Sequence, residues 1–128
     1  MIVTTEEQFS HAVRFLSQHD EWVVDCETNG LQALKGNQLC GVGVGVKSNY
    51  SNLNSGLYYF PFRHQTPDSN LDSSRLTKLM EVMNKCKTIV GYNLKFDLKF
   101  LEKDGLVVND KDLIDVIVMV RLTESTNV

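Results

Sequence analysis

The sequence predicts a mixed α/β fold in which helices pack on a mixed sheet. Two observations predict it. Three strand-like segments follow one another with only loops between them, at residues 22–28, 39–46 and 57–61, and such segments form an antiparallel meander. Further along, a strand-like segment lies between two segments of helical period, and strands reached through helices suggest parallel additions to the sheet.

The first helix and the first strand have clear signals. Apolar residues at helical spacing predict the helix, namely Phe9, Ala12, Val13 and Leu16. Thr4 and Glu7 stand before it at the spacing of a capping box. The strand at residues 22–28 is rich in strand formers, and Asn29-Gly30 ends it.

The second and third strands are predicted as a hairpin. Residues 39–46 alternate with period two, which is typical of a strand. The segment does not open a helix, so its glycines do not form a dinucleotide-binding motif, and we expect them to allow close packing. These glycines are Gly41, Gly43 and Gly45. A polar, turn-rich segment at residues 47–56 leads to the third strand at residues 57–61.

The second half of the chain alternates helix and strand. A second helix is predicted from Leu76, Leu79, Met80, Met83 and Cys86. Residues 88–92 form a short apolar strand, and a third helix ends at Asp104-Gly105. That helix is predicted from Leu94, Leu98 and Leu101. Residues 106–108 are either a strand or part of a link. The run after Asp115 is either a strand, because of its β-branched residues, or a helix with Asp115 as N-cap.

Length and composition set limits on the class of protein. A chain of 128 residues forms one domain, and it contains no apolar run near the ~20 residues of a membrane span. The N-terminus lacks the pattern of a signal peptide, so we expect an intracellular protein. The cysteines are odd in number and widely spaced, which predicts reduced core residues. They are Cys26, Cys40 and Cys86.

The net charge of −3 disfavours a module that holds nucleic acid by phosphate contacts alone. A nuclease that recruits divalent cations tolerates this balance, because the cations supply positive charge. We expect the lysines of the third helix to form a solvated face: Lys95, Lys99 and Lys103. The histidines have no metal-ligand spacing, so surface or loop positions are expected for His11, His19 and His64.

Asp25 and Glu27 are the most informative pair. In a strand, residues i and i+2 point to one face, so these carboxylates project together while Cys26 points to the packed side. Neighbouring carboxylates on an apolar strand repel each other and lose hydration, and a hard divalent cation makes the arrangement favourable. The alternative is a surface pair on an edge strand, which the flanking Val23-Val24 disfavours.

Asn93 and Asp97 form the second candidate. They are four residues apart at the start of the third predicted helix, hence neighbours on one face. Asp97 lies next to the apolar stripe of that helix, where an unpaired carboxylate is costly. The alternative is that Asn93 caps the helix and Asp97 lies at the surface.

Both segments resemble known motifs. Residues 24–31 (VDCETNGL) resemble the Exo I motif of DEDD-type 3′→5′ exonucleases. Residues 93–97 (NLKFD), within a segment at about 91–101, resemble Exo II in the form used by the proofreading domain of family A DNA polymerases from bacteria and phages. Residues 59–64 resemble the third strand and its exit in phage members, and Asp115 with its apolar run resembles the element after Exo II.

The resemblance implies a ribonuclease H-like fold and removal of nucleotides from DNA 3′ ends by hydrolysis with two Mg²⁺ or Mn²⁺ ions. It implies that Asp25 bridges both ions, that Glu27 binds one of them near the terminal 3′-OH, and that Asp97 holds the other through water. The matched substrate-binding positions are Thr28, Leu31 and Asn93.

The fourth acid of the family has no match. Its Exo III motif is an Asp with a Tyr or His four residues before it, and nothing after Asp97 has this form. Asp110, Asp112 and Asp115 lie too close behind Exo II and lack the aromatic residue at that offset. We therefore expect residues 1–128 to be a partial exonuclease domain, C-terminally incomplete and inactive by itself.

Three functions fit these observations. The first is part of a proofreading exonuclease, with a single-stranded DNA 3′ end as substrate and a downstream polymerase or exonuclease segment bearing Exo III as partner. The second is an RNase D-like exoribonuclease. The third is an inactive exonuclease-fold module that binds or supports other molecules. The expected location is the cytoplasm of a bacterial or phage-infected cell, with no membrane partner.

Overall fold

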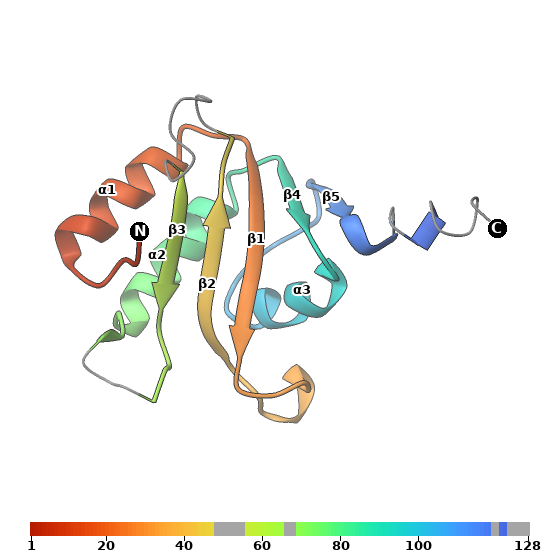
Figure 1. Cartoon of the computed structure of the whole chain (residues 1–128), viewed down its shortest axis with the longest axis horizontal. Coiled ribbons are helices and arrows are strands. Elements are labelled where there is room, and N and C mark those ends of the chain that lie inside the picture. Colours follow the sequence, from red (N-terminus) through yellow and green to blue (C-terminus); the bar gives the residue numbers. More distant parts are fainter. Residues whose placement is uncertain (48–55, 66–68, 119–120, 123–128) are drawn as a thin grey trace.

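A computed structural model of the chain describes residues 1–47, 56–65, 69–118 and 121–122. Its centre is a five-stranded sheet in the order β3-β2-β1-β4-β5 (Figure 1). The strands are β1 (Glu21–Thr28), β2 (Leu39–Gly45), β3 (Leu57–Pro61), β4 (Thr88–Gly91) and β5 (Asp112–Asp115). β1, β2 and β3 form an antiparallel meander, whereas β4 and β5 join the other edge of β1 in parallel. The predicted mixed sheet is confirmed.

Three helices pack on this sheet, and a 3-10 turn follows β1. They are α1 (Glu6–Leu16), α2 (Ser73–Met83), α3 (Leu94–Lys103) and η1 (Ala33–Lys35). α1 buries the predicted apolar set, but the predicted capping residues are wrong by one position. Thr5 accepts from the Gln8 backbone N–H at 3.1 Å, and the Gln8 side chain accepts from the Thr5 N–H at 3.1 Å. Glutamine fills the acceptor role of the capping box as well as glutamate does.

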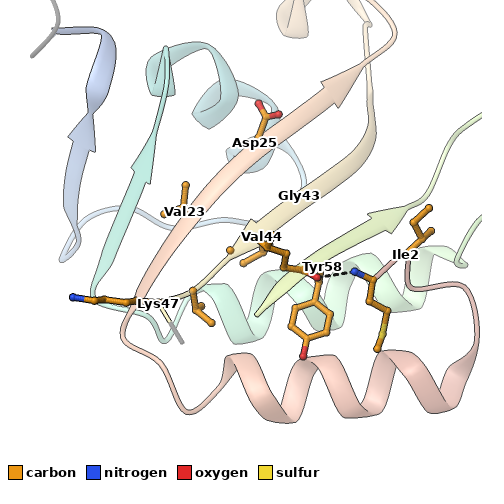
Figure 2. A pocket seen from close by; sticks show the side chains of 11 residues that line it. Ile2, Val23, Asp25, Gly43, Val44, Lys47 and Tyr58 are labelled. Atoms are coloured by element: carbon orange, nitrogen blue, oxygen red, sulfur yellow. Dashed lines mark hydrogen bonds between the residues drawn. The ribbon is translucent and has the colours of Figure 1, made fainter. Parts of the chain in front are cut away.

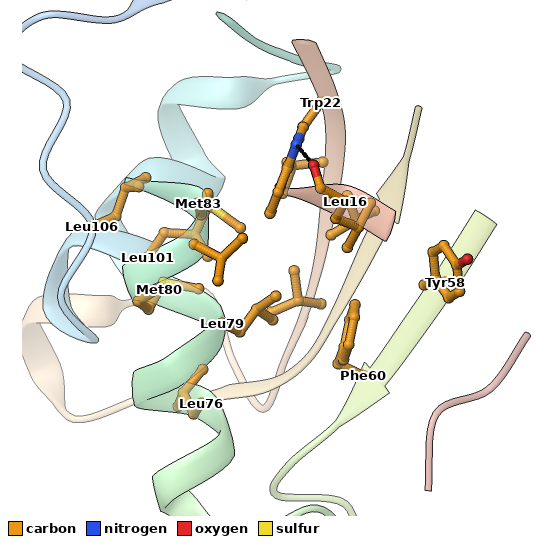
Figure 3. Packing of buried hydrophobic residues seen from close by; sticks show 14 of the residues in the cluster. Leu16, Trp22, Tyr58, Phe60, Leu76, Leu79, Met80, Met83, Leu101 and Leu106 are labelled. Atoms are coloured by element: carbon orange, nitrogen blue, oxygen red, sulfur yellow. Dashed lines mark hydrogen bonds between the residues drawn. The ribbon is translucent and has the colours of Figure 1, made fainter. Parts of the chain in front are cut away.

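The hydrophobic core lies between the helices and one face of the sheet (Figure 3). Trp22 is fully buried there, and its indole N–H donates to the backbone oxygens of Leu16 and His19 at 3.2 and 3.0 Å. Phe60 on β3 and Leu79 on α2 are buried in the same cluster. Cys40 and Cys86 are buried, Cys26 is partly buried, and all three are free thiols, as predicted.

The segment from α2 to β5 differs in detail from the prediction. α2 ends at Met83, so Cys86 is buried beyond the helix. Residues 106–108 are a link and not a strand. β5 was not predicted, because it has four residues and two of them are aspartates. It forms because its backbone pairs with β4 from Thr88↔Asp112 to Gly91↔Asp115.

Residues 116–118 are helical, which favours the N-cap interpretation of Asp115. The Asp115 Oδ1 accepts from the Ile117 backbone N–H at 3.0 Å. Parts of the predicted loop at 47–56 and of the run after Asp115 lie outside the described residues. In the part of the chain that is described, no helix has the length and apolar character needed to span a membrane.

None of α1, α2 and α3 covers the other face of the sheet (Figure 1). On β1, Trp22 and Val24 are buried while Val23, Asp25 and Glu27 are exposed. This alternation is the period of a strand with one packed face. We call the second surface the open face.

Candidate active site

The open face presents the two carboxylates of the first motif. Asp25 lies opposite Gly43 of β2, and Glu27 lies opposite Gly41, so each carboxylate faces a strand residue without a side chain. The register shifts between Glu27 and Thr28, where β1 leaves regular pairing. Cys26 packs against the core, as the alternation predicts. Burial and the surrounding carboxylates raise the pKa of its thiol, so Cys26 stays protonated and neutral.

An apolar groove of about 600 Å³ lies beside Asp25 on this face. Figure 2 shows Val23 and Asp25 projecting from β1, with Gly43 and Val44 on β2. Ile2 lies along the outer edge of the groove, where residues 1–3 pair with β3. The acidic pair therefore stands at the end of an apolar surface.

The start of α3 is set by a tight approach to β1. A Cβ at Gly91 would lie 3.1 Å from the Val24 carbonyl oxygen, so the turn after β4 accommodates only glycine comfortably. Asn93 then adopts the left-handed conformation, with φ 54° and ψ 48°. Its side chain does not cap the helix. Asp115 does so instead, because its Oδ2 accepts from the Leu94 backbone N–H at 3.0 Å.

Asp97 lies in the first turn of α3 and is 4% exposed. The pairing of β4 with β1 ends at Val23↔Val90, and beyond that point the Cys26 backbone donates a hydrogen bond to Asp97. The Oδ2 of Asp97 is buried and has no hydrogen-bond partner among the described residues. The surface alternative for Asp97 is therefore wrong.

The electrostatics of Asp97 join the two motifs. Burial raises its pKa to about 7, and the charges of Asp25, Asp115 and Glu27 act in the same direction, against the bond from Cys26. Carboxylates more than 65 positions apart in sequence are thus close enough to repel one another. A buried carboxylate with an unpaired oxygen beside two exposed carboxylates is the kind of environment that a cation stabilises.

The described side chains do not form a closed metal cage. Within residues 1–47, 56–65, 69–118 and 121–122, no group of three or more His, Cys, Asp or Glu side chains is close enough to hold a metal ion. The donors nevertheless suit a hard divalent cation in type, since all are carboxylate oxygens, and the unpaired Asp97 Oδ2 is available to one. That Asp25, Glu27 and Asp97 hold Mg²⁺ or Mn²⁺ stays a prediction.

The three predicted substrate-binding residues lie on two segments that also carry the acids, namely the end of β1 with its loop and the start of α3. The Thr28 hydroxyl donates to the Gly30 carbonyl at 2.8 Å and holds the turn after β1. Leu31 is 81% exposed just beyond that turn. Asn93 is exposed at the start of α3. Their roles toward a nucleotide stay predictions.

Sequence reasoning gave Asp115 as a possible N-cap of the run that follows it, but missed the cap that it makes on α3. Asp115 caps both α3 and residues 116–118, and its charge acts on Asp97. The cap on α3 depends on β5, which pairs with β4 and was not predicted, so the sequence held no local signal for it. Lys103 is exposed as expected, and its amino group also donates to the carbonyl oxygens of Ala33 and Asn37 at 3.0 and 2.8 Å. Lys95 and Lys99 are exposed as expected.

The family and the fold of the chain are those of exonucleases. A sequence profile of the family described as 3'-5' exonuclease matches residues 1–125, so the chain belongs to that family. No curated protein sequence matches it significantly.

Solved exonuclease structures share the fold, as the predicted ribonuclease H-like architecture requires. The Aedes aegypti Nibbler EXO domain has a TM-score of 0.65 at 10% identity, covering 98% of this chain and 56% of that one. A chain in the structure of the yeast NOT1 MIF4G domain co-crystallised with CAF1 has a TM-score of 0.65 at 11% identity, covering 98% and 72%. The Trypanosoma brucei RNase D complex with RNA U12 has a TM-score of 0.62 at 15% identity, covering 91% and 37%. The chain thus spans little more than half of the Nibbler domain.

Proposed function

We propose that this chain is the acidic half of a proofreading-type 3′→5′ exonuclease site that hydrolyses the terminal phosphodiester of single-stranded DNA. The observation that carries the proposal is the approach of Asp97 on α3 to Asp25 and Glu27 on β1, with one carboxylate oxygen of Asp97 buried and unpaired. Such a carboxylate is costly for stability, and a catalytic role accounts for its presence.

The residues of this chain would act as follows. Hydrolysis joins a water oxygen to the terminal phosphorus, breaks the bond to the 3′ oxygen of the preceding nucleotide, and returns a proton to that oxygen. Asp25, Glu27 and Asp97 would hold two Mg²⁺ or Mn²⁺ ions, which when bound stabilise the charge that develops on phosphate oxygens. Leu31, exposed beyond the Thr28 turn, would support the terminal base, and Asn93 would contact the sugar-phosphate at the start of α3.

The proposal also states that the substrate is DNA and not RNA. The Exo II form of residues 93–97 supports DNA and a polymerase-associated role. A second candidate is an RNase D-like exoribonuclease, favoured by the fold shared with the RNase D complex that contains RNA U12. The two candidates make opposite predictions about substrate preference.

We propose that a polypeptide segment with a Tyr-x-x-x-Asp motif is the partner of this chain. No residue after Asp97 is a Tyr or a His, so residues 98–128 do not supply an aromatic residue that orients the water. The complementing segment would add the fourth carboxylate to those on β1 and α3. Without it, the mispositioned nucleophile costs about tenfold in rate for every 1.4 kcal/mol of lost transition-state stabilisation.

The test is stepwise shortening of end-labelled single-stranded oligonucleotides in Mn²⁺, with and without a separately expressed segment that bears Exo III. We expect shortening only from the 3′ end, only with the segment present, and faster on DNA than on RNA. Asp97→Ala should abolish it. Faster shortening of RNA would establish the second candidate, and shortening that survives both Asp25→Ala and Asp97→Ala would contradict the proposed site.

A further inference from the structure

The open face contains an aromatic residue that shares its rows with the acidic pair. Asp25, Gly43 and Tyr59 lie opposite one another across β1, β2 and β3, and Glu27 and Gly41 form the next row. Directly opposed residues of antiparallel strands project to the same face. The side chain of Tyr59 therefore starts in the row of Asp25, on the surface that carries both carboxylates.

The ring of Tyr59 extends from the row of Asp25 and Gly43 to the neighbouring row of Glu27 and Gly41. A Cβ built on Gly41 would lie 1.9 Å from the Tyr59 hydroxyl oxygen, so this hydroxyl occupies the space that a side chain at position 41 would fill. Cross-strand neighbours have Cβ atoms ~4.5–5.5 Å apart. The hydroxyl is thus a cross-strand neighbour of the Glu27 side chain, and only glycine at position 41 permits this.

The chemistry of the hydroxyl agrees with this position. Burial raises the pKa of Tyr59 to about 12, and among charged groups Glu27 contributes most to the rise. The phenol accordingly keeps its proton near neutral pH and can serve as a hydrogen-bond donor.

His64 holds the hydroxyl in place from the other side. The His64 Nε2 lies 2.5 Å from the Tyr59 hydroxyl oxygen, and the two ring centroids are 5.7 Å apart. The backbone of His64 is itself fixed by Asn70, whose side chain accepts from the His64 N–H at 3.0 Å and donates to the His64 carbonyl at 2.8 Å. His64 lies in a loop, as expected from the sequence, and its ring fixes the position of the Tyr59 hydroxyl.

We propose that Tyr59 is a positioning residue for Glu27. With the His64 Nε2–H donating to the Tyr59 oxygen, the Tyr59 hydroxyl would donate to the Glu27 carboxylate and turn it toward Asp25. The inference rests on the proposed metal-dependent function. Carboxylate ligands are commonly held by such an outer hydrogen bond, and its loss lowers metal affinity or activity by about 10–100-fold.

The experiment is calorimetric titration of the chain with Mn²⁺, together with its thermal unfolding. Tyr59→Phe keeps the ring over Gly41 and removes only the hydroxyl, so we expect Mn²⁺ affinity to fall tenfold or more while the unfolding midpoint without metal stays unchanged. His64→Ala should produce the same loss of affinity, whereas His64→Gln, whose amide can donate to the hydroxyl, should restore most of it. Tyr58→Phe is the matched control, because Tyr58 adjoins Tyr59 on β3 but belongs to the buried cluster.

The outcomes separate this inference from the function on which it rests. Affinity lost in Asp25→Ala but unchanged in Tyr59→Phe overturns the role of Tyr59 alone. Mn²⁺ binding that Asp25→Ala leaves intact, or no binding by the unmodified chain, contradicts the metal site as well. Equal losses in Tyr59→Phe and Tyr58→Phe would show a general effect on β3 and would also overturn the role of Tyr59.

Discussion

The two faces of the sheet are formed by the same strands but carry different kinds of side chain. On the covered face, Trp22, Val24 and Phe60 exclude water, and each is at most 1% exposed. On the open face, positions one residue away carry Asp25, Glu27 and the glycines opposite them. Residue volume decides what is tolerated on the first face, whereas charge and the absence of a side chain decide it on the second.

This difference separates stability from chemistry along one strand. A change on the covered face removes packing contacts that the whole domain shares, because the core is one contiguous cluster. A change on the open face removes a charge that destabilises the folded state and serves another purpose. Substitutions paired across the two faces should therefore affect stability and activity differently.

The largest effect is expected from truncation on the covered face. Phe60→Ala should lower the free energy of unfolding by about 3–5 kcal/mol, since it leaves a cavity under a fully buried ring. Leu57→Ala, on the open side of the same strand and 51% exposed, should cost less than about 1 kcal/mol. Urea unfolding of both variants measures the difference, and equal losses would mean that the open face is also packed in solution.

On the open face, Asp25→Asn should lower activity without lowering stability. We expect 3′-end shortening in the complemented assay to slow by at least about 100-fold, or roughly 2.7 kcal/mol, because the carboxylate charge at the site is lost. Thermal stability should not fall, since a source of repulsion toward Asp97 is removed. Glu21→Gln, an exposed residue at the other end of β1, should leave the rate unchanged.

Asp97 on α3 combines features of the two faces, because its side chain is buried like the core residues and is a carboxyl group like those of Asp25 and Glu27. Above pH 4 the unfolded chain has released this proton, while the folded chain holds it up to a pKa of about 7. Stability without divalent cations should therefore fall as pH rises from about 4 to about 7 and then level off.

Asp97→Asn should remove this decline and leave the chain about 1–2 kcal/mol more stable than the parent at pH 8, because burial of a charge is avoided. Urea titrations at pH 5, 6, 7 and 8 give the slope directly. The exposed Asp112→Asn serves as control, and an unchanged slope in Asp97→Asn would place the titrating group elsewhere.

The smallest expected effect concerns the loop after β1. Leu31→Ser should alter the free energy of unfolding by less than about 0.5 kcal/mol, because the side chain is 81% exposed. It should weaken binding of a single-stranded oligonucleotide a few-fold by removing an apolar surface from the terminal base. Leu34→Ser, 96% exposed on η1, is the matched control, and equal effects of both changes on binding would remove Leu31 from the site.

Much of the fold was predictable because its signals are local. The alternation in residues 39–46 and the apolar spacing in α1 reflect periods that a strand or helix imposes on neighbouring residues. The order of the meander followed from the lack of a predicted helix between its strands. The capping residues of α1 were misplaced by one, because two threonines precede two glutamates and a glutamine, and side-chain geometry chooses among them.

The missed elements depend on partners distant in sequence. β5 is short and half acidic, and it exists because β4 offers free backbone groups at its edge. Asp115 could be recognised as a cap, but the cap it makes on α3, 21 positions earlier, needed the parallel register. Lys103 is exposed, as its place in the lysine stripe predicts, but its contacts with Ala33 and Asn37 depend on the packing of η1 on α3.

The sequence was enough to show that Asp25 and Glu27 share one face of a strand, because the period of a strand is a property of the backbone. It also determined the mixed sheet and the place of the motifs within it. The folded structure was needed to show that Asp97 is buried beside Cys26 with an unpaired oxygen, and that the Tyr59 hydroxyl occupies the space of a side chain at Gly41 next to Glu27. Burial and charge repulsion act through space, so they depend on how β4 and β3 are placed against β1 and β2.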